Sequence, residues 1–547
     1  MRVQSAGPNR ALPATVEAMM RPEIYQDRPR SVELRQTHVS YVFLAGGYVY
    51  KIKKPVRFAF LDASTLARRH QLCLDEVRLN RRLAPDVYLG VVPIVRRGGG
   101  ELALGAAPDG TVDNGGAGAG VVVEWAVRMR RLAEATMLDR MVAEGAVSVA
   151  QIRAIAVRLA AFHGAAAADK GWKYGAAAAV WRLVRGNLEE LALDCAGMIA
   201  PAEMDELEHF AHRVVESRWG LLNRRALGGR VREGHADLRC EHVSLADNAI
   251  TIIDCVEFSE GLRYADVASD VGFLAMDLDR LGACELSDQL VGAYREASGD
   301  AELALLMAFY KFHRALVRAK VESLAARDPA IAPDQRAAAA AAARRYVALA
   351  LDLARQSRPV LVVVCGLSGS GKSTVARRLA DRLGFDWLRS DEIRKRLAGA
   401  GPAERLSSGY AAGAYTREFT QKTYAALLTD AAARLHDGAG VIVDATFAAP
   451  AYRAQARAVA AYAERPVLFV ECIASHDEIV RRLTQRARRP DEVSDADVAT
   501  YLRQRGGFVP LKEIPETCHL VVDTARGLEA AAAAITRRLK SLGPGNG

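Results

Sequence analysis

The sequence lacks the features that would place the chain outside the cell or in a membrane. Its eight cysteines are scattered over 547 residues, and no two of them form a CxxC pair. This spacing is typical neither of a structural zinc site nor of a disulfide-linked secreted domain, so we expect reduced thiols in the cytoplasm. Residues 1–30 contain no apolar secretory segment, and no run of about 18 uncharged apolar residues occurs. Export and membrane insertion are therefore not expected.

Aromatic residues and net charge are also low. Phe, Trp and Tyr make up 6% of the chain and do not alternate with basic residues, as they would on a platform for single-stranded nucleic acid. Lys and Arg exceed Asp and Glu by 74 to 65, and the resulting charge of +9 is mild for this length. It permits an anionic ligand such as a nucleotide without requiring nucleic acid. Apolar residues at 50% and charged residues at 25% exclude a mostly disordered or collagen-like chain.

The length predicts three to four average domains or two larger ones, at roughly 150 residues per domain. Residues 1–30 mix Pro, Arg and Gly and are expected to form a flexible arm. We expect a first domain over 31–335, an Ala-rich linker helix over 336–356 and a second domain over 357–547. The alternative, in which the Ala-rich helix is the last helix of the first domain, stays open.

The two halves differ in the order of their predicted elements. Ser40 to Lys54 reads SYVFLAGGYVYKIKK, where two β-rich runs flank the turn dipeptide Gly46-Gly47 and predict a hairpin. After Arg358-Pro359, strands and helices alternate, which predicts βαβ units around a parallel sheet and an α/β fold. The other elements expected in the first half are a helix over 63–83, strands at 91–94, 121–125 and 250–253, a Gly-rich loop over 98–120, and mostly helices over 132–227 and up to about 355.

A phosphate-binding loop opens the second half. Residues 361–374 read LVVVCGLSGSGKST, a buried-type strand followed by a complete GxxxxGKS pattern and a helix. Glycines let backbone N–H groups wrap a phosphate, Lys372 would reach the β- and γ-phosphate oxygens, and Ser373 would bind Mg²⁺. The nucleotide-binding residues are expected to be Gly366, Leu367, Ser368, Gly369, Ser370, Gly371, Lys372, Ser373 and Thr374.

Two aspartates follow the loop in the positions that phosphoryl transfer requires. Asp444 lies near the end of the predicted strand VIVDATF, where a carboxylate suits Mg²⁺ beside Ser373. Asp391 stands in RSDEIRKRL, about twenty residues after the loop, where a carboxylate could accept the proton of an acceptor hydroxyl. For both aspartates a helix-cap or turn role is the alternative.

With these residues, about residues 359–540 resemble a family of small P-loop kinases that phosphorylate hydroxyl groups. The family includes polynucleotide 5′-kinases, zeta-type toxins, chloramphenicol phosphotransferase and gluconate kinases. The resemblance implies that Asp391 is the acceptor-hydroxyl base. It also implies a lid over the phosphates at residues 481–489, RRLTQRARR, with Arg486 preferred and Arg482 second as the arginines that neutralise charge. A solvated basic helix face is the alternative, and Asp523-Thr524 weakly resembles the family's loop beside the base.

The first half carries a second constellation at residues 233–258, EGHADLRCEHVSLADNAITIIDCVEF. It resembles the catalytic loop of aminoglycoside phosphotransferase-like kinases, and the resemblance covers about residues 30–335. It implies an α+β, protein-kinase-like bilobal fold in which Asp237 orients a hydroxyl proton and Asp254 binds Mg²⁺. His242 stands where the family usually has Asn, and imidazole is a poor ligand for Mg²⁺. Turn or cap carboxylates are the alternative for both aspartates.

Further residues upstream and downstream support the same resemblance. Lys51 and Lys53 share one face of the predicted strand VYKIKK, and the preferred Lys51 could contact nucleotide phosphates and pair with Glu76. The resemblance places the interlobe hinge near Glu124 and Trp125. Asp266 and Asp270 are expected to cap helices rather than take part in chemistry.

Together the chain resembles a bacterial two-module kinase, and we expect a cytoplasmic phosphotransferase that uses ATP and Mg²⁺ with its main site in the second half. A remodelling ATPase is disfavoured because Ala445, not a second acid, follows Asp444. One alternative makes the first half a regulatory nucleotide-binding pseudokinase, and another makes the protein a nucleic-acid 5′-end kinase. A small polar hydroxyl substrate is favoured over nucleic acid, no membrane partner is expected, and the oligomeric state stays open.

Overall fold

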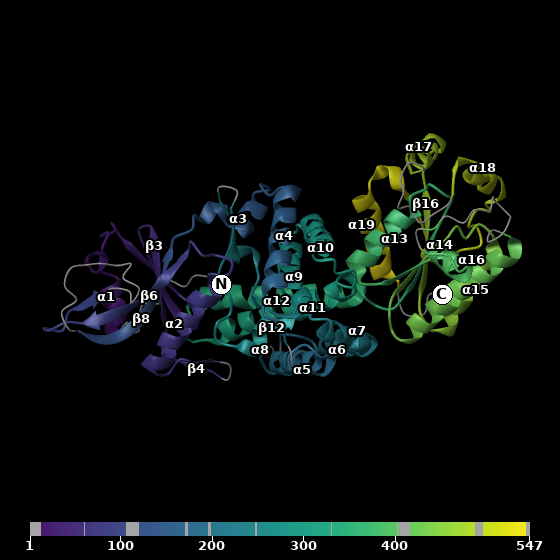
Figure 1. Cartoon of the computed structure of the whole chain (residues 1–547). Coiled ribbons are helices and arrows are strands. Elements are labelled where there is room, and N and C mark those ends of the chain that lie inside the picture. Colours follow the sequence, from purple (N-terminus) through teal and green to yellow (C-terminus); the bar gives the residue numbers. More distant parts are fainter. Residues whose placement is uncertain are drawn as a thin grey trace. The chain divides into compact units, whose positions relative to one another are not determined.

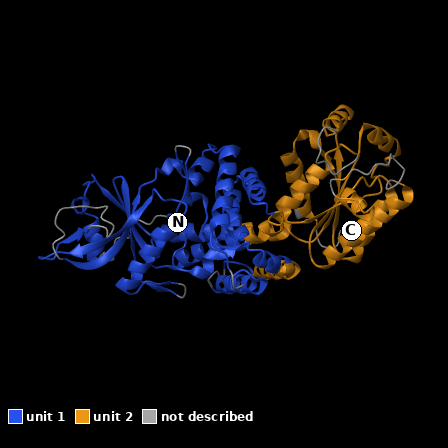
Figure 2. Cartoon of the chain, in the orientation of Figure 1, with its two compact units in different colours: residues 1–200, 221–300, 313–348 blue, residues 201–220, 301–312, 349–547 orange. Residues whose placement is uncertain are grey.

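A computed structural model shows two compact units of this chain (Figures 1 and 2). Unit 1 comprises residues 1–200, 221–300 and 313–348, and unit 2 comprises 201–220, 301–312 and 349–547. The structure describes residues 13–58, 61–105, 120–169, 173–194, 198–246, 249–329, 331–401, 404, 416–486 and 496–542. Among these residues no helix is both long and apolar enough to cross a membrane.

Unit 1 begins with an antiparallel six-stranded sheet in the order β1-β2-β3-β8-β6-β7. Its strands are β1 (Val32–Gln36), β2 (Ser40–Ala45), β3 (Tyr48–Lys53), β6 (Tyr88–Arg96), β7 (Leu102–Leu104) and β8 (Val121–Arg130). The expected hairpin is β2–β3, and Gly46 at its turn has a φ of 60°, which a glycine adopts without strain. Helix α2 (Leu66–Asn80), capped by Thr65, packs on β6 and β8. This packing brings α2 side chains to the face of the sheet that carries Lys51.

The rest of unit 1 is mainly helical, as the sequence predicts. Its helices are α3 (Leu138–Ala143), α4 (Val149–Ala165), α5 (Ala177–Asp194), α8 (Glu260–Arg263), α9 (Val267–Arg280) and α10 (Cys284–Ser298), with most of α7 (Trp219–Leu227), α11 (Ala304–Arg327) and α12 (Pro333–Gln356). Short strand pairs β9 (Val231–Glu233) with β12 (Tyr264–Asp266), and β10 (Val243–Ala246) with β11 (Ala249–Ile252), frame the loop that holds Asp237. The Ala-rich segment is helical, and α12 begins in unit 1 and ends in unit 2.

Unit 2 is built on a parallel five-stranded sheet in the order β14-β15-β13-β16-β17. The strands are β13 (Leu361–Cys365), β14 (Asp386–Arg389), β15 (Val441–Asp444), β16 (Val467–Ile473) and β17 (His519–Asp523). The helices are α13 (Lys372–Leu383), α14 (Ser390–Leu397), α15 (Arg417–His436), α16 (Pro450–Tyr462), α17 (His476–Arg486), α18 (Val498–Gly507) and α19 (Leu528–Ser541), together with α6 (Pro201–Ser217).

The central strand of unit 2 is buried on both faces. Leu361 and Val363 of β13 pack with α15 and α16, whereas Val362 and Val364 pack with α13 and α19. Alternate residues of a strand point to opposite faces, so an unbroken apolar run is what a sheet covered by helices on both sides requires. The predicted α/β architecture with a parallel sheet is confirmed, and it places the carboxyl ends of β13, β14 and β15 at one edge.

Two features differ from the domain organisation expected from the sequence. Residues 13–30 do not form a loose arm, because α1 (Ala14–Met19) and the turn η1 (Pro22–Ile24) bury Val16, Met19 and Tyr25 against the β1–β3 face of the sheet. Residues 1–12 lie outside the described part. Arg213 of α6 donates to the carbonyl oxygens of Gly438 and Ser357 at 3.0 and 3.1 Å, contacts that group α6 with unit 2. The boundary predicted at 356/357 stays a prediction.

A buried histidine makes the stability of unit 1 depend on pH. His313 on α11 is 3% exposed, and Asn187 Nδ2 lies 2.9 Å from its Nε2. The amide can donate to a neutral imidazole but not to a protonated one. Burial, assisted by Arg314 and Lys320, lowers the pKa of His313 to about 3. In the unfolded chain the histidine has an ordinary pKa near 6.5. Between that pH and about 3 the unfolded chain therefore binds a proton at His313 that the folded chain does not bind.

We predict that His313 alone makes unit 1 lose about 2 kcal/mol of unfolding free energy between pH 7 and pH 5, since each pH unit below 6.5 costs about 1.4 kcal/mol. His313→Gln keeps a hydrogen-bond acceptor and should reduce the pH-dependent loss by that amount. Urea unfolding of the intact chain, followed by hydrogen exchange in unit 1 peptides, measures it. The exposed His212→Gln on α6 is the control, and an unchanged slope in His313→Gln would contradict the assignment.

Candidate functional sites

The loop between β13 and α13 has the conformation that its glycines permit. Gly366, Gly369 and Gly371 have φ values of 129°, 81° and 89°, which side-chain-bearing residues rarely adopt. A Cβ on Gly366 would lie 2.4 Å from the carbonyl oxygen of Cys472. Helix α13 begins at Lys372, directly after the loop. The strand, loop and helix expected from the sequence are thus present, and the helix N-terminus offers its free N–H groups to an anion.

Lys372, Ser373 and Asp444 meet at this loop. Asp444 ends β15 and pairs in register with Val364 near the end of β13, so the parallel sheet itself delivers the carboxylate to the loop. The pKa of Asp444 is raised by burial, while Lys372 and a hydrogen bond from Ser373 act in the opposite direction. Lys372 Nζ donates to the carbonyl oxygen of Leu367 at 2.8 Å. The Ser373 hydroxyl and the Asp444 carboxylate are hard oxygen donors and fit Mg²⁺.

Asp391 lies on the same edge of the sheet. It is in the first turn of α14, directly after β14, and β14 pairs with β15 so that Arg389 is beside Asp444. Burial raises the pKa of Asp444, and the charge of Asp391 acts in the same direction. No side chain caps α14 by a hydrogen bond, and its N-cap residue is Arg389. The helix-cap alternative for Asp391 is therefore not what the structure shows.

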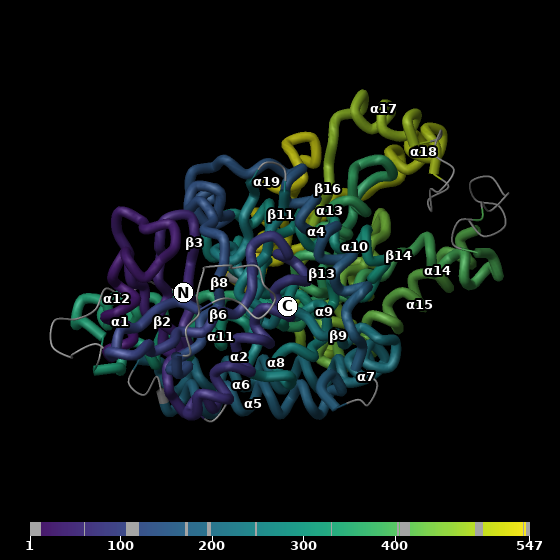
Figure 3. Tube along the Cα trace, turned by 60° about the vertical axis from the view of Figure 1, so that its left-hand side comes forward, coloured from purple at the N-terminus to yellow at the C-terminus, as the bar shows by residue number. Residues whose placement is uncertain are grey.

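Helix α17 covers the loop from the other side. A Cβ on Gly369 would lie 2.9 Å from side-chain carbons of Ile479 and Leu483, so only glycine lets this helix approach. Arg482 donates to Thr524 Oγ1 at 2.8 Å, and that hydroxyl donates to the carbonyl oxygen of Ser370 at 2.8 Å. The pairing joins α17 to the turn after β17, at the Asp523-Thr524 step. α17 and its neighbour α18 lie side by side in both views (Figures 1 and 3).

The two lid arginines lie in different surroundings, and the preference for Arg486 over Arg482 stays a prediction. Arg482 lies against the loop, because a Cβ on Gly371 would be 3.1 Å from its Nη1. Arg486, the preferred residue, ends α17 one turn further on and donates to the carbonyl oxygen of Ala496 at 2.6 Å. The remainder of the arginine run, residues 487–489, lies outside the described residues.

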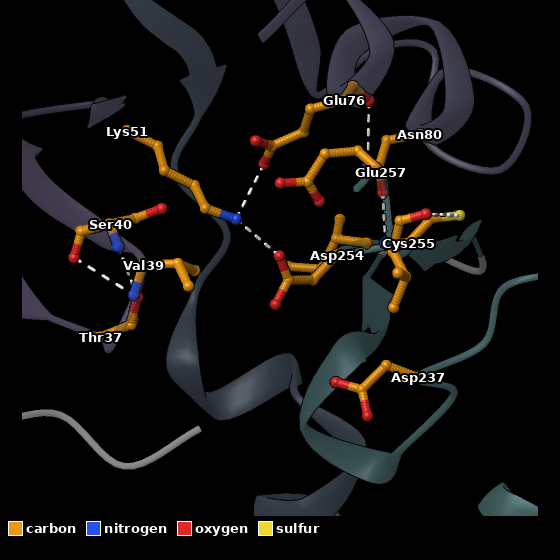
Figure 4. A network of polar contacts seen from close by, with 12 residues as sticks. Thr37, Val39, Ser40, Lys51, Glu76, Asn80, Asp237, Asp254, Cys255 and Glu257 are labelled. Carbon is orange, nitrogen blue, oxygen red and sulfur yellow. Dashed lines mark hydrogen bonds and ion pairs between the residues drawn. The ribbon is translucent and has the colours of Figure 1, made fainter. Parts of the chain in front are cut away.

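The site in unit 1 is built from buried ion pairs (Figure 4). Lys51 of β3 lies 2.8 Å from Glu76 Oε1 of α2 and 2.7 Å from Asp254 Oδ1. Burial opposes the charged form of Lys51, but Asp254 and Glu76 outweigh it and raise the pKa of Lys51 well above its ordinary value. Lys53 pairs with the other oxygen of Glu76 at 2.5 Å and with Glu257. The expected pairing of Lys51 with Glu76 is present.

Asp237 forms a separate ion pair, with Arg239. Arg239 donates from Nε and Nη2 to the two oxygens of Asp237, each at 3.1 Å. Burial opposes the charged carboxylate, but Arg239 and His242 hold the pKa of Asp237 well below its usual range. The His242 ring lies between Asp237 and Asp254, with Nε2 3.5 Å from Asp254 Oδ2. Burial and Arg239 lower the pKa of His242 to about 3, so the ring is neutral near pH 7.

The donor set of unit 1 does not fit Mg²⁺. Asp237, His242 and Asp254 each offer one ligand atom, and the three atoms lie within 4.8 Å of one another. One of the three is an imidazole nitrogen, whereas Mg²⁺ takes oxygen ligands. The Mg²⁺ role that the family resemblance implies for Asp254 is therefore not supported by its neighbours.

Two sequence interpretations in unit 1 are corrected. Glu124 and Trp125 are not at an interlobe hinge, because they pair with Ile94 and Pro93 inside the sheet and β8 continues to Arg130. Glu124 instead binds the guanidinium of Arg69 from α2.

Asp270 is not a helix cap. Its carboxylate accepts the backbone N–H groups of His235 and Ala236 at 2.6 and 2.9 Å and so fixes the loop that carries Asp237. Asp266 does cap α9, as expected, and accepts from Ala268 N–H at 2.9 Å.

Three residues that contact the two sites were not predicted from the sequence. Arg239 follows Asp237 by two positions, and Glu257 follows Asp254 by three, so both stand within the motif that drew attention to their neighbours. Gln504 of α18 accepts the loop N–H of Ser368 at 3.0 Å. It is more than 130 residues from the loop in sequence, and no pattern around it indicates the contact.

Comparisons with known proteins give matches over each half of the chain and over most of its length. A family model described as "AAA domain" matches residues 361–511, which contain the loop, Asp391 and Asp444. A choline/ethanolamine kinase family protein from Mesorhizobium loti is 16% identical, with 61% of this chain and 98% of that one covered at a TM-score of 0.36. A putative kinase from Chloroflexus aurantiacus is 22% identical, with 33% and 98% covered at a TM-score of 0.27.

The region of unit 2 that the family model matches contains the P-loop, and unit 1 pairs a strand lysine with a helix glutamate, a pairing also found in protein kinases. Rv2004c of Mycobacterium tuberculosis, described as an uncharacterized protein, is 33% identical over 478 residues, which cover 87% of this chain and 90% of that one. The same identity and coverage hold for Mb2027c of Mycobacterium bovis. The chain therefore belongs to the protein family that includes Rv2004c and Mb2027c.

Proposed function

We propose that this protein is an ATP- and Mg²⁺-dependent phosphotransferase that moves the γ-phosphoryl group to a hydroxyl acceptor at the site in unit 2. The observation that carries the proposal is the position of Asp391. A P-loop with Lys372, Ser373 and Asp444 serves many nucleotide-binding proteins. A further carboxylate, Asp391 at the neighbouring strand-to-helix junction, supplies the group that a transferase needs and that nucleotide binding alone does not.

The roles follow from the arrangement. Loop N–H groups and Lys372 bind the phosphates, and Ser373 and Asp444 would hold Mg²⁺, which when bound neutralises charge on the transferred group. Asp391 accepts the proton of the acceptor hydroxyl as the phosphoryl group arrives. Arg482, held against the loop by Thr524, adds positive charge at the phosphates. Lys372 must leave the carbonyl oxygen of Leu367, to which it donates here, in order to reach a nucleotide.

A small polar hydroxyl compound is the proposed acceptor. The mild net charge of +9 and the low aromatic content of 6% support it over a polynucleotide, for which clustered basic and aromatic side chains are typical. Transfer to a nucleic-acid 5′ end is the competing outcome, and transfer in the cytoplasm is the expected setting.

Removal of the loop lysine tests the assignment to unit 2. We predict that Lys372→Ala in the full chain reduces nucleotide turnover at least about a hundredfold, because a preorganised charge contact to the phosphates is lost. Release of labelled phosphate from ATP, with and without a mixture of candidate acceptors, measures it. Lys422→Ala on α15, where the side chain is 65% exposed, is the matched control. Turnover that is equal in the two variants would refute the assignment.

Asp391 tests transfer against simple nucleotide binding. We predict that Asp391→Asn keeps ATP affinity within a few-fold and lowers kcat by about 10²–10⁴, the range for a positioned base. For a small acceptor the apparent affinity should depend weakly on salt, whereas a polynucleotide would show a steep slope from counterion release. Normal kcat in Asp391→Asn would remove the residue from the mechanism. A steep slope with transfer to a 5′-hydroxyl would replace the proposed acceptor by nucleic acid.

For unit 1 we propose a second function, nucleotide binding without phosphoryl transfer. Lys51, Glu76 and Asp254 are assembled as a phosphate site requires. Asp237, however, is already neutralised by Arg239 on both oxygens, and a carboxylate in that state is a weak base. This combination supports a regulatory pseudokinase role over a second transferase.

We predict that ADP or ATP stabilises the Lys372→Ala chain, in which the unit 2 loop is weakened, and that adding Lys51→Ala abolishes the stabilisation. Thermal unfolding with and without nucleotide measures both. Asp237→Asn in the Lys372→Ala background should leave the residual turnover unchanged. If Asp237→Asn removes a measurable residual turnover, unit 1 is an active kinase and the pseudokinase proposal fails.

A further inference from the structure

The strongest unexplained feature of unit 1 is the ring of His242. A protein-kinase-like site implies Mg²⁺ beside Asp254, yet the third donor atom near the two aspartates is an imidazole nitrogen. The ring is 4% exposed and is fixed on both sides, so it is not a surface histidine that happens to lie near acids.

The backbone sets which ring nitrogen can bind a metal. His242 Nδ1 lies 2.7 Å from the carbonyl oxygen of Asp237, a group that can only accept. Nδ1 therefore carries the proton and donates it, and the lone pair is on Nε2. A histidine ligand usually has its other nitrogen anchored in this way, because the anchor fixes both the tautomer and the ring orientation.

The unprotonated nitrogen, Nε2, faces a carboxylate group that is also held in place. Nε2 lies 3.5 Å from Asp254 Oδ2, while Asp254 Oδ1 is bound by Lys51 at 2.7 Å. Asp254 has a φ of 66°, and its N–H donates to Tyr88 Oη at 3.1 Å. Lys51 and Tyr88 thus leave one oxygen of Asp254 directed toward the histidine. Asp237 supplies the third donor atom, a carboxylate oxygen, and the three donor atoms lie within 4.8 Å of one another.

We propose that Asp237, His242 and Asp254 form a binding site for a divalent first-row transition metal of the kind that accepts imidazole, such as Zn²⁺ or Co²⁺, in preference to Mg²⁺. One nitrogen and two carboxylate oxygens suit these ions, whereas Mg²⁺ requires oxygen ligands. The site is separate from the Mg²⁺ site proposed for unit 2, and its metal preference does not depend on phosphoryl transfer there.

Arg239 competes with a metal ion for the same donor atoms. Its Nη2 lies 3.1 Å from His242 Nε2 as well as from Asp237 Oδ2. A metal on Nε2 requires the guanidinium to give up the histidine, while its Nε contact with Asp237 Oδ1 can remain. Metal and Arg239 therefore exclude each other at one nitrogen atom.

The binding test uses the full chain with the substitution Asp444→Asn. This substitution weakens the metal site proposed for unit 2, so the remaining metal binding can be assigned to unit 1. Co²⁺ and Mg²⁺ are titrated separately by calorimetry without nucleotide, and Co²⁺ is also followed by its visible absorption. We expect one Co²⁺ site that binds at least tenfold more tightly than Mg²⁺. His242→Asn and His242→Gln should weaken Co²⁺ about 10- to 100-fold, the usual cost of disturbing a metal ligand set. His212→Asn, on the exposed face of α6, should change nothing.

Two results would overturn the proposal: equal affinity for Co²⁺ and Mg²⁺, or a Co²⁺ site that survives both His242 variants. Because a buried histidine can be needed for folding, native crystals soaked with Zn²⁺ give an independent answer without any substitution. An anomalous peak between Asp237, His242 and Asp254 supports the site, and peaks only at other positions refute it. Neither measurement uses turnover, so failure here and failure of the proposed function remain distinct.

Discussion

The buried charges around Glu76 are the constraint on which unit 1 depends. Two ammonium groups, on Lys51 and Lys53, face three carboxylates, on Glu76, Glu257 and Asp254. Isolated, each buried ion would be costly, and removal of one partner from a buried pair typically destabilises a protein by about 3–5 kcal/mol. The network therefore couples β3, α2 and the turn after β11 into one arrangement. It also leaves one more carboxylate than ammonium group, so this end of the site attracts a further cation.

The two candidate sites use different groups to bind a negatively charged phosphate and the cation that accompanies it. Unit 2 relies on backbone, because glycines at positive φ and the start of α13 present N–H groups, and its side-chain ligands for a cation are oxygen atoms. Unit 1 relies on side chains from distant segments of the chain. Its two candidate cation ligands, Asp254 and Asp237, are already paired with Lys51 and Arg239. A backbone cradle fits any nucleotide phosphate with Mg²⁺. A side-chain site can change its metal preference with one residue, and His242 is the residue that would do so under the proposal for unit 1.

Contiguous signals explain what the sequence predicted well. The P-loop is one uninterrupted segment whose strand, loop and helix each carry their own pattern, and Lys51 with Glu76 follows from a strand lysine and the next helix. The hinge position was wrong because nothing in VVVEWAVRMR marks where β8 ends, and the strand runs five residues past Trp125 to Arg130. The choice between Arg482 and Arg486 stays a prediction, because the contact of Arg482 with Thr524, some 40 residues later, has no local signal in the sequence. Burial of Val16, Met19 and Tyr25 depends on a partner surface, a face of the six-stranded sheet, that local composition does not reveal.

The roles of Arg239 and His242 are best understood together. Arg239 balances the charge of Asp237 and also contacts Nε2 of His242, the nitrogen that a metal would need. The loop would therefore have two states, one with Arg239 at Nε2 and one with a metal there. With Arg239 on Nε2, Asp237 is paired on both oxygens and is poorly suited to accept a proton. With a metal on Nε2, one of those contacts is released, and Asp237 shares its charge with the metal instead. In neither state is Asp237 an unpaired carboxylate, because each state supplies a cation to it. Under the roles proposed for unit 1, the same two side chains would disfavour Mg²⁺ and would also occupy the general base, so binding without transfer would follow from a single local arrangement.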